Sequence, residues 1–228
     1  MNKINKFPSN VLVVGVAGPS GSGKDLIGDY AKELGFYKLH LAQRLKEACK
    51  IIFNQTDDEV YSEIGKAKEN DYWGMTNRKI LQLFGSDAMH PIFGPDIWCR
   101  ALHITLDMLI SRGVTKFVIC DVRFPHEVIY FKEHFGGNFI YVQRPGITNL
   151  LTNEEQNHAS ETSLKDVVNQ FGHSMWSIMN TGSKTQLRKA TMDGLLHIIG
   201  SNEEVIQGEL QAFEDFQNSQ VPAAVSNS

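Results

Sequence analysis

The chain has few cysteines, no excess of basic residues and no long hydrophobic run, and each absence excludes a class of protein. Only three of its 228 residues are cysteines (Cys49, Cys99 and Cys120), an odd number without metal-ligand spacing. We therefore expect buried, reduced thiols rather than a disulfide framework. A formal net charge of −4 and a pI of about 6.1 give no positive field for general binding to DNA or RNA.

The sequence also predicts no membrane-spanning segment. No apolar run approaches the roughly 20 residues that a membrane-spanning helix needs, and residues 1–10 are polar and too short for a signal peptide. We expect no membrane partner. With 42% hydrophobic and 21% charged residues, the length suits one α/β domain with a substantial core.

A phosphate-binding loop is the most specific motif present. Residues 18–25 read Gly-Pro-Ser-Gly-Ser-Gly-Lys-Asp, after an apolar run at 11–16 and before a helix-compatible stretch. Glycines let successive backbone N–H groups point at phosphates, and Lys24 would place a cation on the β- and γ-phosphates beside the positive end of the helix. Asp25 stands where Ser or Thr is usual. Both flanks favour this interpretation over an empty glycine-rich turn. The predicted ATP-binding residues of the loop are Gly18, Ser20, Gly21, Ser22, Gly23, Lys24 and Asp25.

Strands alternate with helices after this loop, which predicts an α/β fold with a mostly parallel sheet and the ligand at the carboxyl ends of its strands. We expect residues 1–200 to form one domain, with a helical substrate-side segment at 54–112 and a mobile lid at 144–162. Residues 201–228 read as an acidic, partly disordered tail. Strands are predicted at 11–16, 36–41, 116–120, 138–142 and 174–179, and helices at 24–34, 43–53, 76–89, 95–112, 125–134 and 184–199.

A polar cluster, Asp121-Val-Arg-Phe-Pro-His-Glu127, follows the strand at 116–120. A carboxylate at this point is placed to hold Mg²⁺, directly or through water, beside the phosphate loop. Arg123 and Glu127 are four residues apart at a helix start and can orient one another. The alternative is a capping aspartate with a surface ion pair. The ligand-facing edge of the sheet favours the functional interpretation.

The helix predicted at 76–89 carries Arg78, Gln82 and Ser86 at intervals of four residues, on a face distinct from its apolar stripe. An ordinary solvated face is one interpretation of this spacing. A kinase that acts on small phosphates, however, needs an arginine fork on the acceptor phosphate, and Arg78 with Lys79 is a candidate pair.

Two further residues have alternative roles. Trp98 lies at the edge of the next helix, where it either packs in a core or interface or stacks on a nucleobase, and spacing does not decide between these. Arg144 opens the predicted lid and could contact ATP phosphates or adenine on closure. His158-Ala-Ser-Glu161 in the same segment has no nearby cysteine or second histidine, so we expect a hydrogen-bonding cluster rather than a metal site.

Taken in order, these motifs resemble the deoxynucleoside monophosphate kinases encoded by large bacteriophages. The resemblance covers about residues 11–165, and the aspartate that departs from the general loop pattern matches this family. It is carried by Gly23-Lys24-Asp25, Arg78-Lys-Ile-Leu-Gln-Leu-Phe-Gly-Ser-Asp87, Trp98, Asp121-Val-Arg-Phe-Pro-His-Glu127, Arg144-Pro-Gly and His158-Ala-Ser-Glu161.

The resemblance implies a three-layer P-loop kinase fold and the reaction of ATP with a deoxynucleoside monophosphate (dNMP) to give ADP and the diphosphate, with Mg²⁺. It implies that Lys24 and the loop amides bind the ATP phosphates and that Asp25 assists the metal or the transferring group. The predicted metal ligands are Asp25 and Asp121, directly or through water. Family members are often homodimers, and the expected location is the cytoplasm, of the host cell if the chain is phage-encoded. The acceptor site would comprise Arg78, Lys79, Trp98, Asp121, Arg123 and Glu127, to which the helix face adds Gln82; of these, Arg78, Arg123 and Glu127 would act in catalysis with Lys24 and Asp25.

Two other functions stay open at this point. One is a different small-molecule P-loop kinase, such as a dephospho-coenzyme-A kinase. The other is a switch protein that hydrolyses nucleoside triphosphates, which is less favoured because this short chain has no obvious arginine-finger module or DNA-binding segment.

Overall fold

A five-stranded sheet forms the centre of the computed structural model, which describes residues 7–146 and 157–219. The strand order is β2-β5-β1-β6-β7, and each neighbouring pair is parallel. This confirms the predicted α/β class and places the phosphate loop after the central strand. The strands are β1 (Leu12–Ala17), β2 (Tyr37–His40), β5 (Lys116–Val122), β6 (Asn138–Gln143) and β7 (Trp176–Met179).

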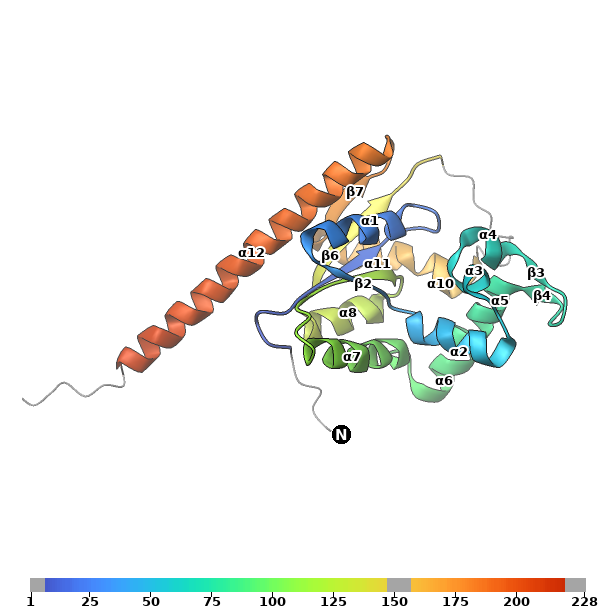
Figure 1. The fold of residues 1–228 in the computed structure, drawn as a ribbon, viewed down its shortest axis with the longest axis horizontal. Coiled ribbons are helices and arrows are strands. Elements are labelled where there is room, and N and C mark those ends of the chain that lie inside the picture. The colour runs from blue at the N-terminus through green and yellow to red at the C-terminus, as the bar shows by residue number, and fades with distance from the viewer. Residues whose placement is uncertain (1–6, 147–156, 220–228) are drawn as a thin grey trace, which may run out of the picture.

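Helices cover both faces of the sheet and complete three layers (Figure 1). In β1, Val14 and Val16 pack against the first helical layer, whereas Val13 packs against the second. Because successive side chains are buried on opposite faces, the strand reads as one continuous apolar run. The first layer comprises α1 (Lys24–Ala31) and α12 (Lys184–Ser219), and the second comprises α7 (Ile97–Ile110), α8 (Pro125–His134) and α11 (Leu164–Phe171).

A smaller core of Leu45, Cys49, Val60 and Leu81 supports the helices beside the carboxyl ends of the strands. The three cysteines are buried and free, as predicted. The elements around this core are α2 (Gln43–Phe53), α3 (Asp57–Tyr61), α4 (Glu63–Ala67), the hairpin β3 (Glu69–Asn70) with β4 (Met75–Thr76), and α5 (Asn77–Gln82).

The helix that begins after Thr76 does not stay α-helical. Thr76 caps α5 by accepting a hydrogen bond from the Lys79 amide. The chain then widens into a π-helical segment, η2 (Leu83–Ala88), and continues as α6 (Met89–Phe93). Insertions of π-helix are rare and occur frequently at functional sites, and this one forms a wall of the pocket described below.

The last helix extends well past its predicted end near residue 199. Gly200 alone costs only about 1 kcal/mol relative to alanine, and good helix formers follow it, so α12 continues to Ser219 and projects away from the sheet (Figure 1). Residues 220–228 and most of the predicted lid (147–156) lie outside the described residues; α10 (Ala159–Thr162) begins shortly after them. In the part of the chain that is described, no helix has the length and apolarity to cross a membrane.

Candidate active site

The phosphate loop leaves β1 and turns into α1, and one glycine makes this turn possible. Gly23 has φ 108°, and a Cβ atom at this position would lie 2.8 Å from Nδ2 of Asn180. Only glycine tolerates both conditions. Asn180, directly after β7, donates a hydrogen bond of 2.9 Å to the Ser22 carbonyl. The loop is therefore tied to the edge strand by a residue that sequence reasoning missed.

Two side chains of the loop fit an oxyanion. Lys24 is buried and donates to the carbonyl oxygens of Gly18 and Pro19, both at 2.7 Å, so its ammonium group lies over the loop. The buried Oγ of Ser22 has no hydrogen-bond partner among the described residues. Buried hydroxyl groups normally form a hydrogen bond. The backbone N–H groups of the loop beside Ser22 suit a bound phosphate.

A β-bulge directs Asp121 toward the loop. The β1–β5 register shifts between Gly15 and Ala17, so that Cys120 and Asp121 of β5 stand opposite a single residue of β1. Asp121 has φ 72°, a left-handed conformation that few residues other than glycine adopt. Bulges change the direction of a side chain, and backbone strain of this kind is concentrated at functional sites.

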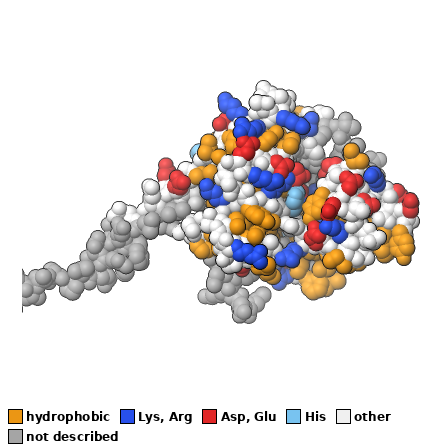
Figure 2. Space-filling view, in the orientation of Figure 1, with side chains coloured by type: hydrophobic (Ala, Val, Ile, Leu, Met, Phe, Trp, Pro, Cys, Tyr) orange, Lys and Arg blue, Asp and Glu red, His pale blue; other side chains and the backbone are white. Residues whose placement is uncertain are grey.

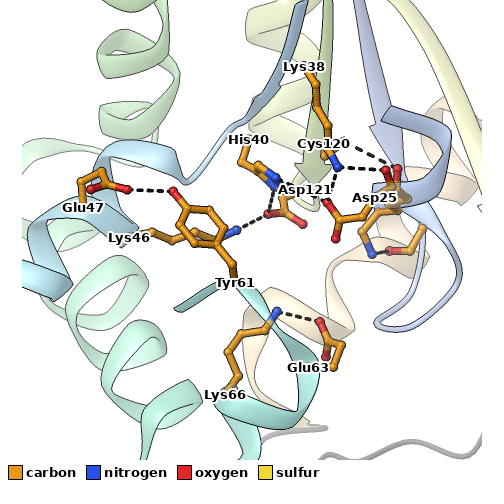
Figure 3. Close-up of polar contacts among 12 residues, drawn as sticks. Asp25, Lys38, His40, Lys46, Glu47, Tyr61, Glu63, Lys66, Cys120 and Asp121 are labelled. Carbon is orange, nitrogen blue, oxygen red and sulfur yellow. Dashed lines mark hydrogen bonds and ion pairs between the residues drawn. The ribbon is translucent and has the colours of Figure 1, made fainter. Parts of the chain in front are cut away.

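His40 joins the Asp121 and Asp25 carboxylates (Figure 3). Its Nδ1 lies 3.1 Å from Asp121 Oδ2, and its Nε2 lies 3.4 Å from Asp25 Oδ1. Lys46 Nζ bonds to Asp121 Oδ2 at 2.7 Å, and Lys38 Nζ lies 3.2 Å from Asp25 Oδ1. Burial by itself would raise the pKa of Asp121, but Lys46 and His40 outweigh it and hold that pKa well below its ordinary value. Asp121 is therefore an anion at neutral pH.

The two carboxylates differ in accessibility: 58% of the Asp25 side chain is exposed, against 14% for Asp121. Among the described residues, there is no group of three His, Cys, Asp or Glu side chains that could hold a metal ion by itself. Mg²⁺ does not need one, because it keeps several waters and takes one or two carboxylates together with substrate phosphates. The donor set fits a magnesium ion that arrives with a nucleotide.

A pocket opens beside this cluster, between α2, α5, α7 and α8. It combines four cationic side chains with apolar and aromatic walls, which suits a ligand with one anionic end and one flat end. Of the seven predicted acceptor residues, all except Lys79 line it. The cations are Lys46, Lys66, Arg78 and Arg123, and the walls include Leu41, Leu45, Leu81, His90, Trp98 and Phe124.

Arg78 is buried at this pocket and is positioned to bind an anion. Its Nη2 donates a hydrogen bond of 2.6 Å to Glu63 Oε2, while its Nε is buried without a hydrogen-bond partner within the described ranges. The predicted Arg78–Lys79 pair is not assembled here, because Lys79 does not line the pocket. Lys66 of α4 lies there instead, as a second buried cation.

Glu127 is buried at the same pocket and caps α8. Its Oε2 accepts the backbone N–H groups of Arg123 at 2.6 Å and Phe124 at 2.9 Å. Burial raises the pKa of Glu127 to about 7, although both hydrogen bonds oppose the shift. Glu127 therefore contacts Arg123 through the backbone amide of Arg123, whereas the sequence predicted a pairing of the two side chains.

Trp98 packs in a core, the first of its two predicted roles, and its contact with a nucleobase stays a prediction. Its indole packs against the small core around Leu45 and also lines the pocket. Its Nε1 donates a hydrogen bond of 2.9 Å to the Gly85 carbonyl in the π-helical segment. His158, which lies in the described part of the predicted lid segment, also contacts the π-helical segment, because its Nε2 lies 2.9 Å from Asp87 Oδ1. Arg144 is exposed just after β6.

Sequence reasoning missed His40, Lys46, Glu63 and Lys66, which belong to no motif. Lys46 did leave a signal, since it lies on the same helical face as the apolar Cys49. A lysine on a buried face needs an anionic partner. Glu63 and Lys66 lie in the polar stretch at 54–74, in which the sequence shows no recognised motif.

Comparisons with known proteins found similar sequences. The sequence pattern of the deoxynucleotide monophosphate kinase family matches residues 60–190, more than half of the chain. The "Putative deoxynucleotide monophosphate kinase" of Acanthamoeba polyphaga mimivirus is 32% identical over 168 residues, covering 69% of this chain and 84% of that protein. The family match begins after the phosphate loop, so that loop is supported by its own sequence and geometry.

Similar solved structures include dephospho-CoA kinase from Campylobacter jejuni, with 16% identity and a TM-score of 0.47 over 85% of this chain and 98% of that one. Another is shikimate kinase from Acinetobacter baumannii, with 14% identity and a TM-score of 0.42 over 86% of this chain and 98% of that one. Similarity at this level says nothing about the substrate.

Proposed function

Because the chain belongs to the deoxynucleotide monophosphate kinase family, we propose that the phosphate loop and the adjoining pocket form its active site. The reaction transfers the γ-phosphate of ATP to a dNMP and gives ADP and the diphosphate. One observation carries the assignment of the site: Glu63 accepts hydrogen bonds from Ser20 of the loop at 2.8 Å and from Arg78 of the pocket at 2.6 Å. The phosphate loop and the cationic pocket are therefore linked through a single carboxylate.

On the donor side, Lys24 and the loop amides hold the ATP phosphates. Lys24 moves from the Gly18 and Pro19 carbonyls to phosphate oxygens, and Ser22 Oγ gains a partner. Arg144 contributes a further cation when the lid segment closes over the nucleotide.

On the acceptor side, Arg78 and Arg123 bind the dNMP phosphate, with Lys66 and Lys46 beside them. Trp98 and Phe124 contact the base, and Gln82 supplies a polar group near it. A phosphate monoester is largely ionised near neutral pH, so no strong general base is needed. The residues align two phosphates and neutralise their charge, which is the main requirement of phosphoryl transfer.

Magnesium completes the proposed site. Asp25 and Asp121 would hold the ion, directly or through water, and His40 fixes the direction of both carboxylates. When bound, Mg²⁺ neutralises charge on the transferring phosphate oxygens.

An acceptor panel tests this function. ADP release is measured by a coupled assay with each dNMP, each ribonucleotide and dephospho-coenzyme A. We expect turnover that depends on a dNMP. A preference for dephospho-coenzyme A, or hydrolysis of ATP without any acceptor, would contradict the proposal.

We further propose that the chain is a homodimer that does not bind nucleic acid in general. The exposed Ile104 and Met108 of α7 are candidates for the dimer interface. Basic and acidic side chains are intermingled on the face shown in Figure 2, which does not suit a DNA-binding surface. Light scattering of the Ile104→Asp variant, compared with the natural chain, tests the interface, because a monomeric natural chain would contradict it.

A further inference from the structure

Glu63, the first residue of α4, contacts the donor and the acceptor sides of the site at once. Its Oε2 accepts hydrogen bonds from Ser20 Oγ at 2.8 Å and from Arg78 Nη2 at 2.6 Å. Its Oε1 accepts one from Lys66 Nζ at 2.6 Å, a contact drawn in Figure 3. One carboxylate therefore binds one loop hydroxyl and two cations of the pocket.

A carboxylate at this place needs a physical reason, because both proposed ligands of the site are anions that it repels. The reason lies in the burial of its partners: only 4% of the Arg78 side chain and 9% of the Lys66 side chain are exposed. Buried cations require an anionic partner. Burial alone would raise the pKa of Glu63, but Lys66 and Arg78 outweigh it and hold the pKa well below its ordinary value. Glu63 is therefore charged at neutral pH.

Glu63 leaves one edge of the Arg78 guanidinium available for an oxyanion. Glu63 engages Nη2, whereas Nε is buried without a hydrogen-bond partner in the described part of the chain. An arginine binds oxyanions through two parallel N–H groups. A phosphate can therefore pair with the Nε edge while Nη2 stays on Glu63.

We propose that Glu63 is a positioning residue that holds Arg78 and Lys66 in their phosphate-binding orientation and couples them to the phosphate loop through Ser20. This inference rests on the proposed active site. When the pocket is empty, Glu63 supplies the negative charge that the acceptor phosphate otherwise supplies. When the phosphate binds, Glu63 keeps Arg78 directed at it at the cost of some repulsion.

The proposal predicts opposite effects on affinity and turnover. Glu63→Gln removes one negative charge next to the phosphate site, so the acceptor should bind several-fold more tightly to the ATP-free enzyme. The same change releases Arg78 and Lys66 from their fixed orientation. Because misplacement of about 1 Å can cost about a hundredfold in rate, kcat should fall by about tenfold or more.

The experiment measures binding of dNMP and of inorganic phosphate by calorimetry without ATP, together with kcat, KM and Tm. The matched control is Glu69→Gln, which removes an exposed carboxylate from β3 of the same segment and should change none of these. Glu63→Asp restores the negative charge on a side chain that is one methylene shorter. Acceptor affinity should therefore return to the natural value, while kcat recovers only in part.

Two results would overturn the proposal. One is that Glu63→Gln weakens acceptor binding and lowers kcat and Tm together, which is the effect of a purely structural residue. The other is that binding and turnover stay unchanged. If Glu63→Gln does not fold, Ser20→Ala tests the link to the loop. It should lower kcat and leave acceptor affinity without ATP unchanged, and an unchanged kcat would refute the coupling.

Failure of the proposed function gives a different result. In that case the natural enzyme itself shows no dNMP-dependent ADP release. Phosphate binding still tests Glu63, because Glu63→Gln must bind inorganic phosphate more tightly than the natural chain does.

Discussion

At the scale of single residues, the site depends on carboxylates whose surroundings differ. Asp121 is kept anionic by Lys46 and His40, whereas burial raises the pKa of Glu127 to about 7. Asp25, at the first turn of α1, is the most exposed of the three. The first two lie on or near the same strand end, yet one suits cation binding and the other is held close to neutrality.

Asp25→Asn tests the role of the unusual loop residue. The change keeps the loop backbone and Lys24 but removes the negative charge that the proposed metal requires. We expect most of the turnover to be lost while ATP affinity, measured by calorimetry, is retained. Asp29→Asn is the control, since Asp29 also pairs with Lys38 but lies one turn away on α1. Unchanged turnover in Asp25→Asn would refute the role.

Glu127→Gln tests the pKa of the buried carboxyl through stability. Its folded pKa of about 7 lies above the ordinary 4.5, so the folded state holds the extra proton between these values and Glu127 destabilises the fold progressively as pH rises from 4.5 to 7. The free energy of unfolding of Glu127→Gln should therefore increase relative to that of the natural chain as the pH rises from 5 to 8, by on the order of 3 kcal/mol at most.

The measurement for Glu127→Gln is urea unfolding at several pH values, with Glu133→Gln on the exposed side of α8 as the control. Arg123, Asp121 and Cys99 face Glu127 in both proteins, so their effects largely cancel in the difference. A difference that does not vary with pH would contradict the shifted pKa.

At the scale of elements, helices with strong local signals were predicted to within a residue, and those shaped by packing were not. The helices at 43–53 and 125–134 have the predicted bounds. The π-helical segment was not predicted, because its cause is tertiary: a Cβ atom on Gly85 would lie 2.5 Å from Leu45 Cδ2, and Trp98 binds the Gly85 carbonyl. A helix face alone does not reveal such a close approach.

Trp98→Phe tests whether this segment shapes the acceptor pocket. The variant keeps an aromatic ring but loses the hydrogen bond to Gly85, which is worth about 1 kcal/mol. We expect KM for dNMP to rise several-fold while KM for ATP is unchanged. Trp73→Phe is a matched control, because Trp73 Nε1 also donates to a backbone carbonyl, that of Phe53, but Trp73 does not line the pocket. Equal effects of the two variants on KM for dNMP would contradict the role.

At the scale of the whole molecule, the site is assembled from segments far apart in the chain. The strand β2 contributes His40, the helix α2 contributes Lys46, and α4 contributes Glu63 and Lys66. Asp121 comes from the bulge in β5. Parallel strands bring their carboxyl ends to one edge of the sheet, and the helices between β2 and β5 lie beside that edge.

Nucleotide binding should therefore stabilise the whole fold. At an ATP concentration of about 100 times Kd, binding adds about 2.7 kcal/mol, which for a domain of this size corresponds to a rise in Tm of about 5 to 10 °C. Thermal unfolding with and without ATP measures the shift, and Lys24→Met should reduce it. The absence of any shift in the natural chain would contradict nucleotide binding by the loop.

The sequence by itself determined the features that depend on local order. These are the phosphate loop between an apolar strand and a helix, the alternation of strands and helices, and the Asp121–Glu127 cluster at a strand end. Tertiary structure alone decided that Lys66, rather than Lys79, joins Arg78 in the pocket and that Glu63 joins the pocket to the loop. The reason is physical: backbone propensity and periodicity act over a few residues, whereas the pairing of buried charges depends on which distant segments are packed together.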